Sequence, residues 1–220
     1  MPTLDIAAHP SPNCGPRRDG LHPHLIVIHY TAMTSATAAL ARLCDPQAEV
    51  SAHYLISNHG DVTQMVDEGQ RAWHAGAGEW AGQDDINSRS VGIELDNRGD
   101  HPFSELQMHA LERLLAGIMA RHGIPPAGVI GHSDMAPGRK SDPGARFDWA
   151  RLARLGLARA AGNGPAPDTA DAASFRKAAQ AAGFTAPCDD ATLLDTVRLR
   201  YRPHATGPLT PADLAVLPDA

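Results

Sequence analysis

The chain has 220 residues, of which 43% are hydrophobic and 20% are charged, as in a globular protein with a sizeable core. Its net charge of -6 and its lack of a long basic segment argue against nucleic acid as a partner. The chain has no apolar run of about 18 residues or more, so we expect no membrane span.

The three cysteines are an odd number at wide spacing, which argues against a disulfide framework. The N-terminus lacks the basic start and the apolar stretch of a secretory signal. We therefore expect a cytoplasmic protein, or a periplasmic one if a leader has been removed.

The N-terminal part predicts an arm, a strand, a helix and a hairpin. Residues 1–20 are rich in Pro, Gly, Asn and Arg and predict an irregular arm. Residues 25–28 are continuously apolar, which indicates a strand buried on both faces. An Ala-rich helix over 34–44 and a hairpin over 53–66 are expected next.

The middle of the chain predicts a long loop, a strand and a helix. Residues 73–90 are Gly-rich and polar, and loops of that length inside a compact domain usually serve function. The strand at 91–96 alternates, so that Glu94 lies on the face opposite Val91, Ile93 and Leu95. A capping box at Ser104 opens a helix that ends near residue 123.

The remaining elements complete an α/β fold: a central mixed β-sheet flanked by helices, plus a small C-terminal helical domain. We expect a strand at 129–131, a closing helix at 147–157 and a linker at 161–170. Residues 171–220 carry three short helical patterns with few large apolar side chains. Such a tail forms a marginal core alone, and it either packs on the main domain (1–160) or folds as a small satellite.

Three side chains suggest a metal site. His29 and His132 each follow an apolar strand, and Asp142 comes ten residues after His132. Because residues i and i+2 of an extended segment face the same way, Lys140 and Asp142 are expected to face one cavity. Two histidines and an aspartate make a three-ligand Zn²⁺ site that leaves a fourth position open, as catalysis requires. Taken singly, each residue also fits an ordinary surface or buried position.

Hydrolysis at such a site needs a proton acceptor and a cation. Glu94 is the best candidate for the base, with Asp96 on the same strand face as the second choice. Lys140, one of two lysines in the chain, would stabilise a developing oxyanion. Alternatively, its ammonium only pairs with Glu94 or Asp142 as a structural bridge. The set predicts amide or ester hydrolysis.

Several motifs then occur in an order that resembles a known family. They are His29-Tyr-Thr31, Ser51-Ala-His-Tyr-Leu-Ile56, Arg71-Ala-Trp-His-Ala-Gly76, Val91-Gly-Ile-Glu-Leu-Asp-Asn-Arg98, Gly131-His-Ser-Asp134 and Ala136-Pro-Gly-Arg-Lys-Ser-Asp-Pro-Gly144. Over residues 10–157 the chain resembles the zinc-dependent N-acetylmuramoyl-L-alanine amidases, which are related to amidase-type phage lysozymes and peptidoglycan recognition proteins.

The resemblance implies zinc ligation by His29, His132 and Asp142, water activation by Glu94 and stabilisation of the tetrahedral intermediate by Lys140. It implies cleavage of the amide between the lactyl group of N-acetylmuramic acid, or its 1,6-anhydro form, and L-alanine in peptidoglycan fragments. Such fragments would be the partners, in cell-wall turnover or recycling. We expect substrate contacts from six residues: His53, Trp73, His74, Ala75, Asn97 and Arg139.

Two departures and the tail refine the resemblance. Tyr30 stands where cytosolic recycling amidases carry asparagine, and Asp85 stands where we would expect arginine. These two positions favour the broad-specificity, envelope-anchored members of the family.

Residues 194–203 and 207–214 resemble the three-helix peptidoglycan-binding domain attached to such amidases. The tail could bind glycan, brace the main domain or mediate self-association, and the sequence leaves the oligomeric state open. A non-catalytic muropeptide-binding protein is the alternative function.

Overall fold

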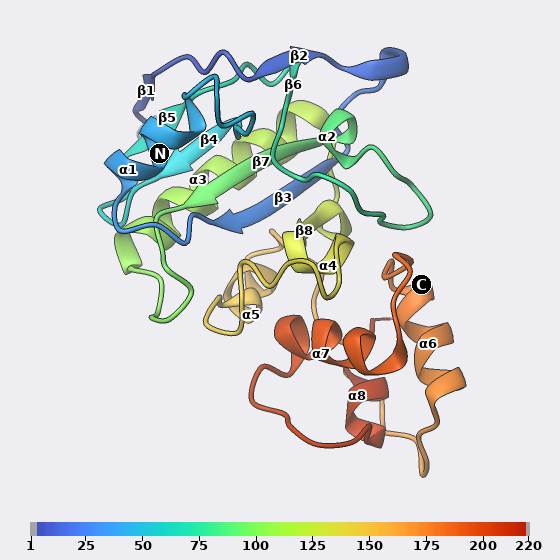
Figure 1. The fold of residues 1–220 in the computed structure, drawn as a ribbon. Coiled ribbons are helices and arrows are strands. Elements are labelled where there is room, and N and C mark those ends of the chain that lie inside the picture. Colours follow the sequence, from blue (N-terminus) through green and yellow to red (C-terminus); the bar gives the residue numbers. More distant parts are fainter. Residues whose placement is uncertain (1–3, 219–220) are drawn as a thin grey trace.

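The computed structural model describes residues 4–218, and its centre is a mixed six-stranded sheet (Figure 1). Only the hairpin strands β4 and β5 are antiparallel; every other neighbouring pair is parallel. The strands, in their order across the sheet, are β1 (Ile6–Ala8), β5 (Val62–Gln64), β4 (Tyr54–Ile56), β7 (Ser90–Leu95), β3 (Leu25–Tyr30) and β8 (Val129–Gly131). This confirms the expected mixed sheet.

The N-terminal arm is more regular than its composition predicts. Strand β1 adds to the sheet beside β5, and β2 (Cys14–Pro16) pairs with β6 (Gln70–Ala72) in a separate two-stranded sheet. The expectation of an irregular arm was therefore wrong. The residues of β1 are exposed and those of β2 are half-buried or exposed, so the arm needs no hydrophobic alternation. Backbone pairing with β5 and β6 holds these strands, and local composition does not reveal such pairing.

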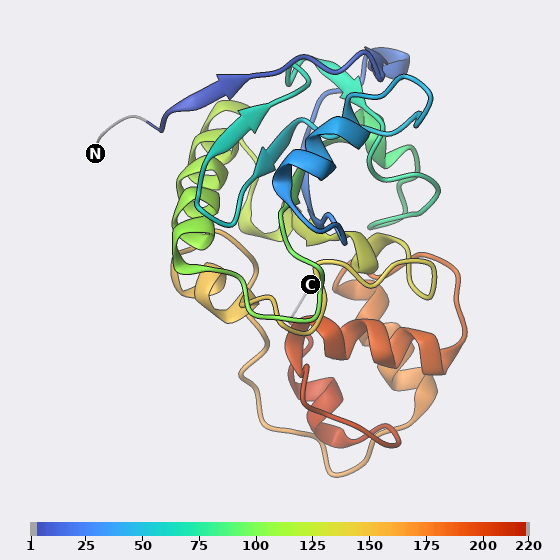
Figure 2. The same cartoon turned by 60° about the vertical axis from the view of Figure 1, so that its left-hand side comes forward.

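One face of the sheet is covered by α3 (Glu105–His122) and α5 (Trp149–Arg154), as Figure 2 shows for α3. The helix α3 begins where Ser104 Oγ accepts from the Gln107 N–H at 3.1 Å. It ends at Gly123, whose φ of 65° suits glycine at a helix terminus. The apolar side chains of β7 face α3, so Glu94 faces the opposite side of the sheet.

Two separate groups of elements pack on the opposite face of the sheet. The helix α1 (Ala36–Leu43) covers the side of the hairpin. A second hydrophobic cluster runs from β3 and β8 through α2 (Ile86–Arg89) and α4 (His132–Met135) to the C-terminal helices. These helices, grouped together in Figures 1 and 2, are α6 (Ala172–Ala181), α7 (Asp190–Tyr201) and α8 (Pro211–Ala215). The tail therefore packs on the main domain.

Residues 73–90 carry part of this packing. They were expected to form one long loop, but residues 86–89 form α2, and Trp80 and Gln83 form an isolated bridge. Trp80 is buried and packs edge-to-face against Phe184 of the tail, with ring centroids 5.0 Å apart.

No helix within residues 4–218 has both the length and the apolar character needed to cross a bilayer.

Candidate active site

The sheet brings the candidate residues together at the carboxyl ends of its parallel strands. His29 lies near the end of β3 and is directly paired in register with Glu94 of the neighbouring β7. His132 follows β8 on the other side of β3 and begins α4. Since adjacent parallel strands end at the same edge, residues more than 100 positions apart in the chain meet there.

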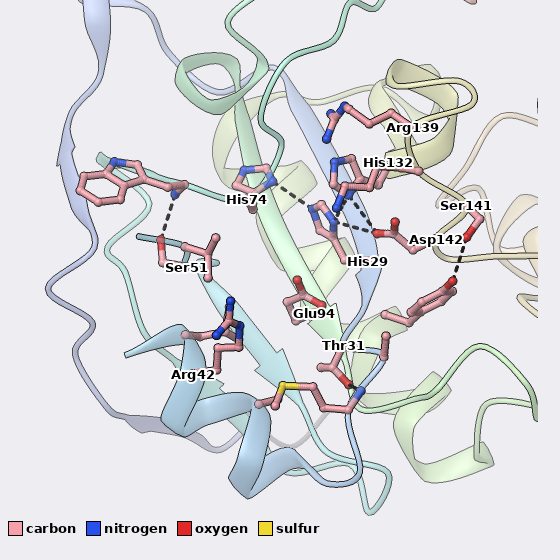
Figure 3. A pocket seen from close by; sticks show the side chains of 18 residues that line it. His29, Thr31, Arg42, Ser51, His74, Glu94, His132, Arg139, Ser141 and Asp142 are labelled. Carbon is pink, nitrogen blue, oxygen red and sulfur yellow. Dashed lines mark hydrogen bonds and ion pairs between the residues drawn. The ribbon is translucent and has the colours of Figure 1, made fainter. Parts of the chain in front are cut away.

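His29, His132 and Asp142 form a tight triangle of possible ligand atoms (Figure 3). The two Nδ1 atoms lie 2.9 Å apart, and each lies 3.0 Å from Asp142 Oδ2. All three side chains are buried. Among the residues that the structure describes, this is the one cluster of His, Cys, Asp and Glu with this arrangement.

The hydrogen-bond network around His29 assigns its protons. Ser90 Oγ donates to Ile86 O at 2.6 Å and therefore accepts from His74 Nε2–H at 3.2 Å. His74 Nδ1 then carries a lone pair and accepts from His29 Nε2–H at 3.0 Å. Burial lowers the pKa of His29 to about 4 and that of His74 well below its usual value, so both rings are neutral. His29 Nδ1 therefore points a lone pair into the triangle.

His132 is assigned in the same way. Its Nε2–H donates to the carbonyl oxygen of Ala75 at 2.8 Å, so a neutral His132 points the lone pair of Nδ1 at Asp142. In these tautomers two imidazole lone pairs and a carboxylate oxygen repel one another across 2.9–3.0 Å. A cation removes this repulsion, and two nitrogens with one oxygen are a donor set that Zn²⁺ accepts while keeping a position open. The residues present fit a zinc ion.

Glu94 lies beside this triangle with an unusual carboxyl group. Its Oε2 is buried and has no hydrogen-bond partner within residues 4–218. Burial, and then the charge of Asp142, raise the pKa of Glu94 to about 8, while Lys140 acts in the opposite direction. A carboxylate with a raised pKa is a better proton acceptor near neutral pH.

Lys140 and Arg139 line the same pocket and supply positive charge. Within the described part of the chain the Lys140 ammonium forms no ion pair with Glu94 or Asp142, so it is not a structural bridge between them. Arg139 donates to the carbonyl oxygens of Ala75, at 2.7 Å, and Ala77. The guanidinium therefore holds the loop that also positions His132.

A pocket of about 330 Å³ opens onto these groups. Of the residues expected from sequence, the pocket is lined by His29, Trp73, His74, Glu94, His132, Arg139, Lys140 and Asp142. Sequence reasoning missed others, among them Thr31, Met33, Arg42, Val50, Ser51 and Ser141. Helical spacing could have indicated Arg42, because Ala39, Arg42 and Leu43 lie at i, i+3 and i+4 and all reach the pocket from α1.

Three expected substrate contacts lie outside the lining. His53 is fully buried; its Nδ1 accepts from the Gly92 N–H at 2.9 Å and its Nε2 lies 3.1 Å from Gln70 O. Ala75 acts through its carbonyl oxygen, and its side chain is buried. Asn97 is buried and accepts from the N–H of Gly99 at 2.7 Å, which shapes the turn after β7.

A mixed sheet that brings two histidines and an aspartate within metal-ligating distance, with a buried carboxyl group and a lysine lining the same pocket, is the arrangement expected of a metal-dependent hydrolase. A profile of the N-acetylmuramoyl-L-alanine amidase family matches residues 19–145. The chain belongs to this family.

Individual relatives agree with the family assignment. Over 205 residues the chain is 38% identical to the N-acetylmuramoyl-L-alanine amidase AmiD of Escherichia coli K12, covering 86% of this chain and 70% of AmiD. It is 33% identical over 160 residues to the 1,6-anhydro-N-acetylmuramyl-L-alanine amidase AmpD of E. coli, covering 65% of this chain and 87% of AmpD.

A solved structure shares the fold. The complex of E. coli AmiD with anhydro-N-acetylmuramic acid-L-Ala-D-γ-Glu-L-Lys superposes with a TM-score of 0.81 at 32% identity. The match covers 90% of this chain and 89% of the AmiD chain.

Proposed function

We propose that this protein hydrolyses the amide between the lactyl group of N-acetylmuramic acid, or its 1,6-anhydro form, and the L-alanine of a peptidoglycan fragment. The observation that carries the proposal is the triangle of possible ligand atoms of His29, His132 and Asp142, with Glu94 and Lys140 lining the same pocket. The E. coli AmiD structure, which contains an anhydro-muropeptide, supports this substrate class.

His29 Nδ1, His132 Nδ1 and Asp142 Oδ2 would hold the zinc ion. When bound, zinc would polarise the substrate carbonyl and acidify a water molecule. Glu94 takes a proton from the attacking water and delivers it to the alanine nitrogen as the C–N bond breaks. Lys140 stabilises the negative charge that develops on the carbonyl oxygen. The products are a free lactyl carboxylate and a peptide with a free N-terminal amine.

A pair of substitutions tests this division of roles. Glu94→Gln keeps the shape of the side chain and removes the base, so we expect kcat to fall by about 10²-fold or more while zinc content is unchanged. Asp142→Ala removes a ligand, so we expect loss of zinc and of activity together. Metal analysis and mass spectrometry of the products from an anhydro-muropeptide measure both effects.

Each result has a contrary outcome. Near-normal turnover by Glu94→Gln excludes this residue as the base, and full zinc occupancy in Asp142→Ala excludes it as a ligand. If the wild-type protein binds the muropeptide without cleaving the amide, the chain is a binding protein and the proposal is wrong.

A further inference from the structure

The tail reaches the metal-ligand segment through one buried ion pair. Arg200 lies on α7 and its Nη1 is 2.5 Å from Asp134 Oδ2 of α4. Only 2% of the Arg200 side chain and 1% of the Asp134 side chain are exposed. The guanidinium also lies over the Trp149 ring, 3.9 Å from its centroid. The pair therefore joins the tail to the catalytic part of the chain in a water-excluded position.

The same guanidinium contacts both ends of the segment that carries His132. Asp134 Oδ2 accepts from the Gly131 N–H at 2.8 Å, and Arg200 Nη2 donates to Val129 O at 3.1 Å. Within this segment, the Ser133 N–H donates to the Asp142 carbonyl oxygen at 2.9 Å. Arg200 and Asp134 thus hold the backbone before His132, at Val129 and Gly131, and Arg200 also anchors the side chain of Asp134, which follows His132. The Ser133 N–H of the same segment in turn holds the backbone of Asp142, the second candidate ligand.

The loop that follows α4 also packs against α7. A Cβ atom built on Gly138 would lie 3.0 Å from Thr192 Cγ2, so the loop that carries Arg139 and Lys140 closely approaches the helix. These contacts continue the hydrophobic cluster that α4 shares with the tail helices.

We propose that Arg200 is a positioning residue, and that the C-terminal helices hold the segment of His132 in its metal-binding conformation. This role is separate from any binding of glycan by the tail. It rests on the proposed function only in taking His132 and Asp142 as zinc ligands. A buried ion pair contributes little net stability compared with apolar packing, so its benefit lies in the fixed geometry of the groups it contacts.

The full-length chain offers a matched control two residues away on α7. Arg198 pairs with Asp213 at 2.8 Å, and 6% and 0% of these side chains are exposed. This second buried pair lies wholly within the tail. Arg200→Met and Arg198→Met therefore remove the same group from comparable surroundings, and only the first breaks a contact to the His132 segment.

Two readouts other than activity test the proposal. Zinc affinity is measured by competition with a chelator, and hydrogen exchange of the Gly131 amide is measured in metal-free protein. We expect Arg200→Met to weaken zinc binding roughly tenfold or more, as loss of an outer-shell support does, and to speed exchange at Gly131. We expect Arg198→Met to leave both unchanged.

An unpaired buried carboxylate could unfold Arg200→Met, so the double variant Asp134→Asn with Arg200→Met removes both charges. Weak zinc binding in a stably folded double variant supports the positioning role. Wild-type zinc affinity in that variant, or equal losses in Arg200→Met and Arg198→Met, overturns it.

Failure of the proposed function would be visible separately. Cleavage of a muropeptide by the wild-type protein tests the function, whereas exchange at Gly131 needs neither zinc nor substrate.

Discussion

At the scale of single residues, the site depends on which nitrogen of each histidine carries a proton. His74 decides this for His29, because its Nδ1 accepts from His29 Nε2–H at 3.0 Å. The ring of His74 lies against Gly92, where a Cβ atom would come within 2.5 Å of His74 Cγ. The absence of a side chain at Gly92 therefore allows His74 to reach His29. An outer hydrogen bond of this kind orients a metal ligand and raises its basicity.

We predict that His74→Leu weakens zinc binding by about 10- to 100-fold, because His29 loses the acceptor that holds its tautomer. His74→Asn, whose amide oxygen can accept the same proton, is the matched variant and is expected to lose less. Chelator competition measures both affinities. Equal zinc affinity in His74→Leu and the wild type would contradict this role, while the contact of His74 with substrate stays a separate prediction.

At the scale of elements, Glu68 links the segment between β5 and β6 to three neighbours. Its carboxylate accepts from Tyr54 of β4 at 2.7 Å and from Arg121 at the end of α3 at 2.6 Å. His122 Nε2 lies 2.7 Å from the same carboxylate. The backbone carbonyl oxygen of Glu68 accepts from Arg17 of the N-terminal arm at 2.8 Å. One residue thereby joins the hairpin, the long helix and the arm.

This junction predicts an acid-dependent loss of stability. Burial would raise the pKa of Glu68, but hydrogen bonds from Arg121, Tyr54 and His122 outweigh it and lower the pKa to about 2. A carboxyl group whose pKa is lower in the folded state stabilises the fold above its unfolded value, near 4.5. That contribution is lost as the pH falls from about 4.5 towards about 2.

Urea unfolding of the wild type and Glu68→Gln near neutral pH and below the lowered pKa measures this contribution. We expect the wild type to be the more stable at neutral pH and the difference to shrink in acid. A difference that does not change with pH would show that the carboxylate charge contributes nothing.

At the scale of the whole molecule, the tail and the sheet share one hydrophobic cluster. This cluster joins Val27 of β3 and Ile130 of β8 to Phe175 and Val197 of the tail. Backbone contacts add to it: the Ala81 N–H donates to Gly183 O at 2.9 Å. Because the apolar surface of the tail is buried against the catalytic part of the chain, neither surface is satisfied alone.

We therefore predict a single cooperative thermal unfolding transition for the full chain. Phe184→Ala removes the ring that packs on Trp80, and it should lower the free energy of unfolding by about 3–5 kcal/mol without splitting the transition. Differential scanning calorimetry measures both. Two separate transitions, of which Phe184→Ala shifts only one, would show that the tail folds as an independent unit.

Local patterns accounted for most of the fold and for the candidate ligands. The alternation in 91–96 places Glu94 opposite the core, and the apolar runs before His29 and His132 place both at strand ends. The capping box at Ser104 places the start of α3. Periodicity and capping depend on neighbours within a few residues, so one sequence is enough to predict them.

Only the tertiary structure decided what each of these groups contacts. The proton of His132 is assigned by the carbonyl of Ala75, 57 residues away, and Arg200 meets Asp134 across 66 residues. No periodic pattern in the sequence predicts such pairs, because the distance between their two residues in space depends on how the sheet, the long loop and the tail pack together. The sequence by itself therefore determined which chemical groups this protein has and, for the central strands and the long helix, on which element they lie. Packing decided which of them share a proton, a cluster of possible metal ligands or a buried charge.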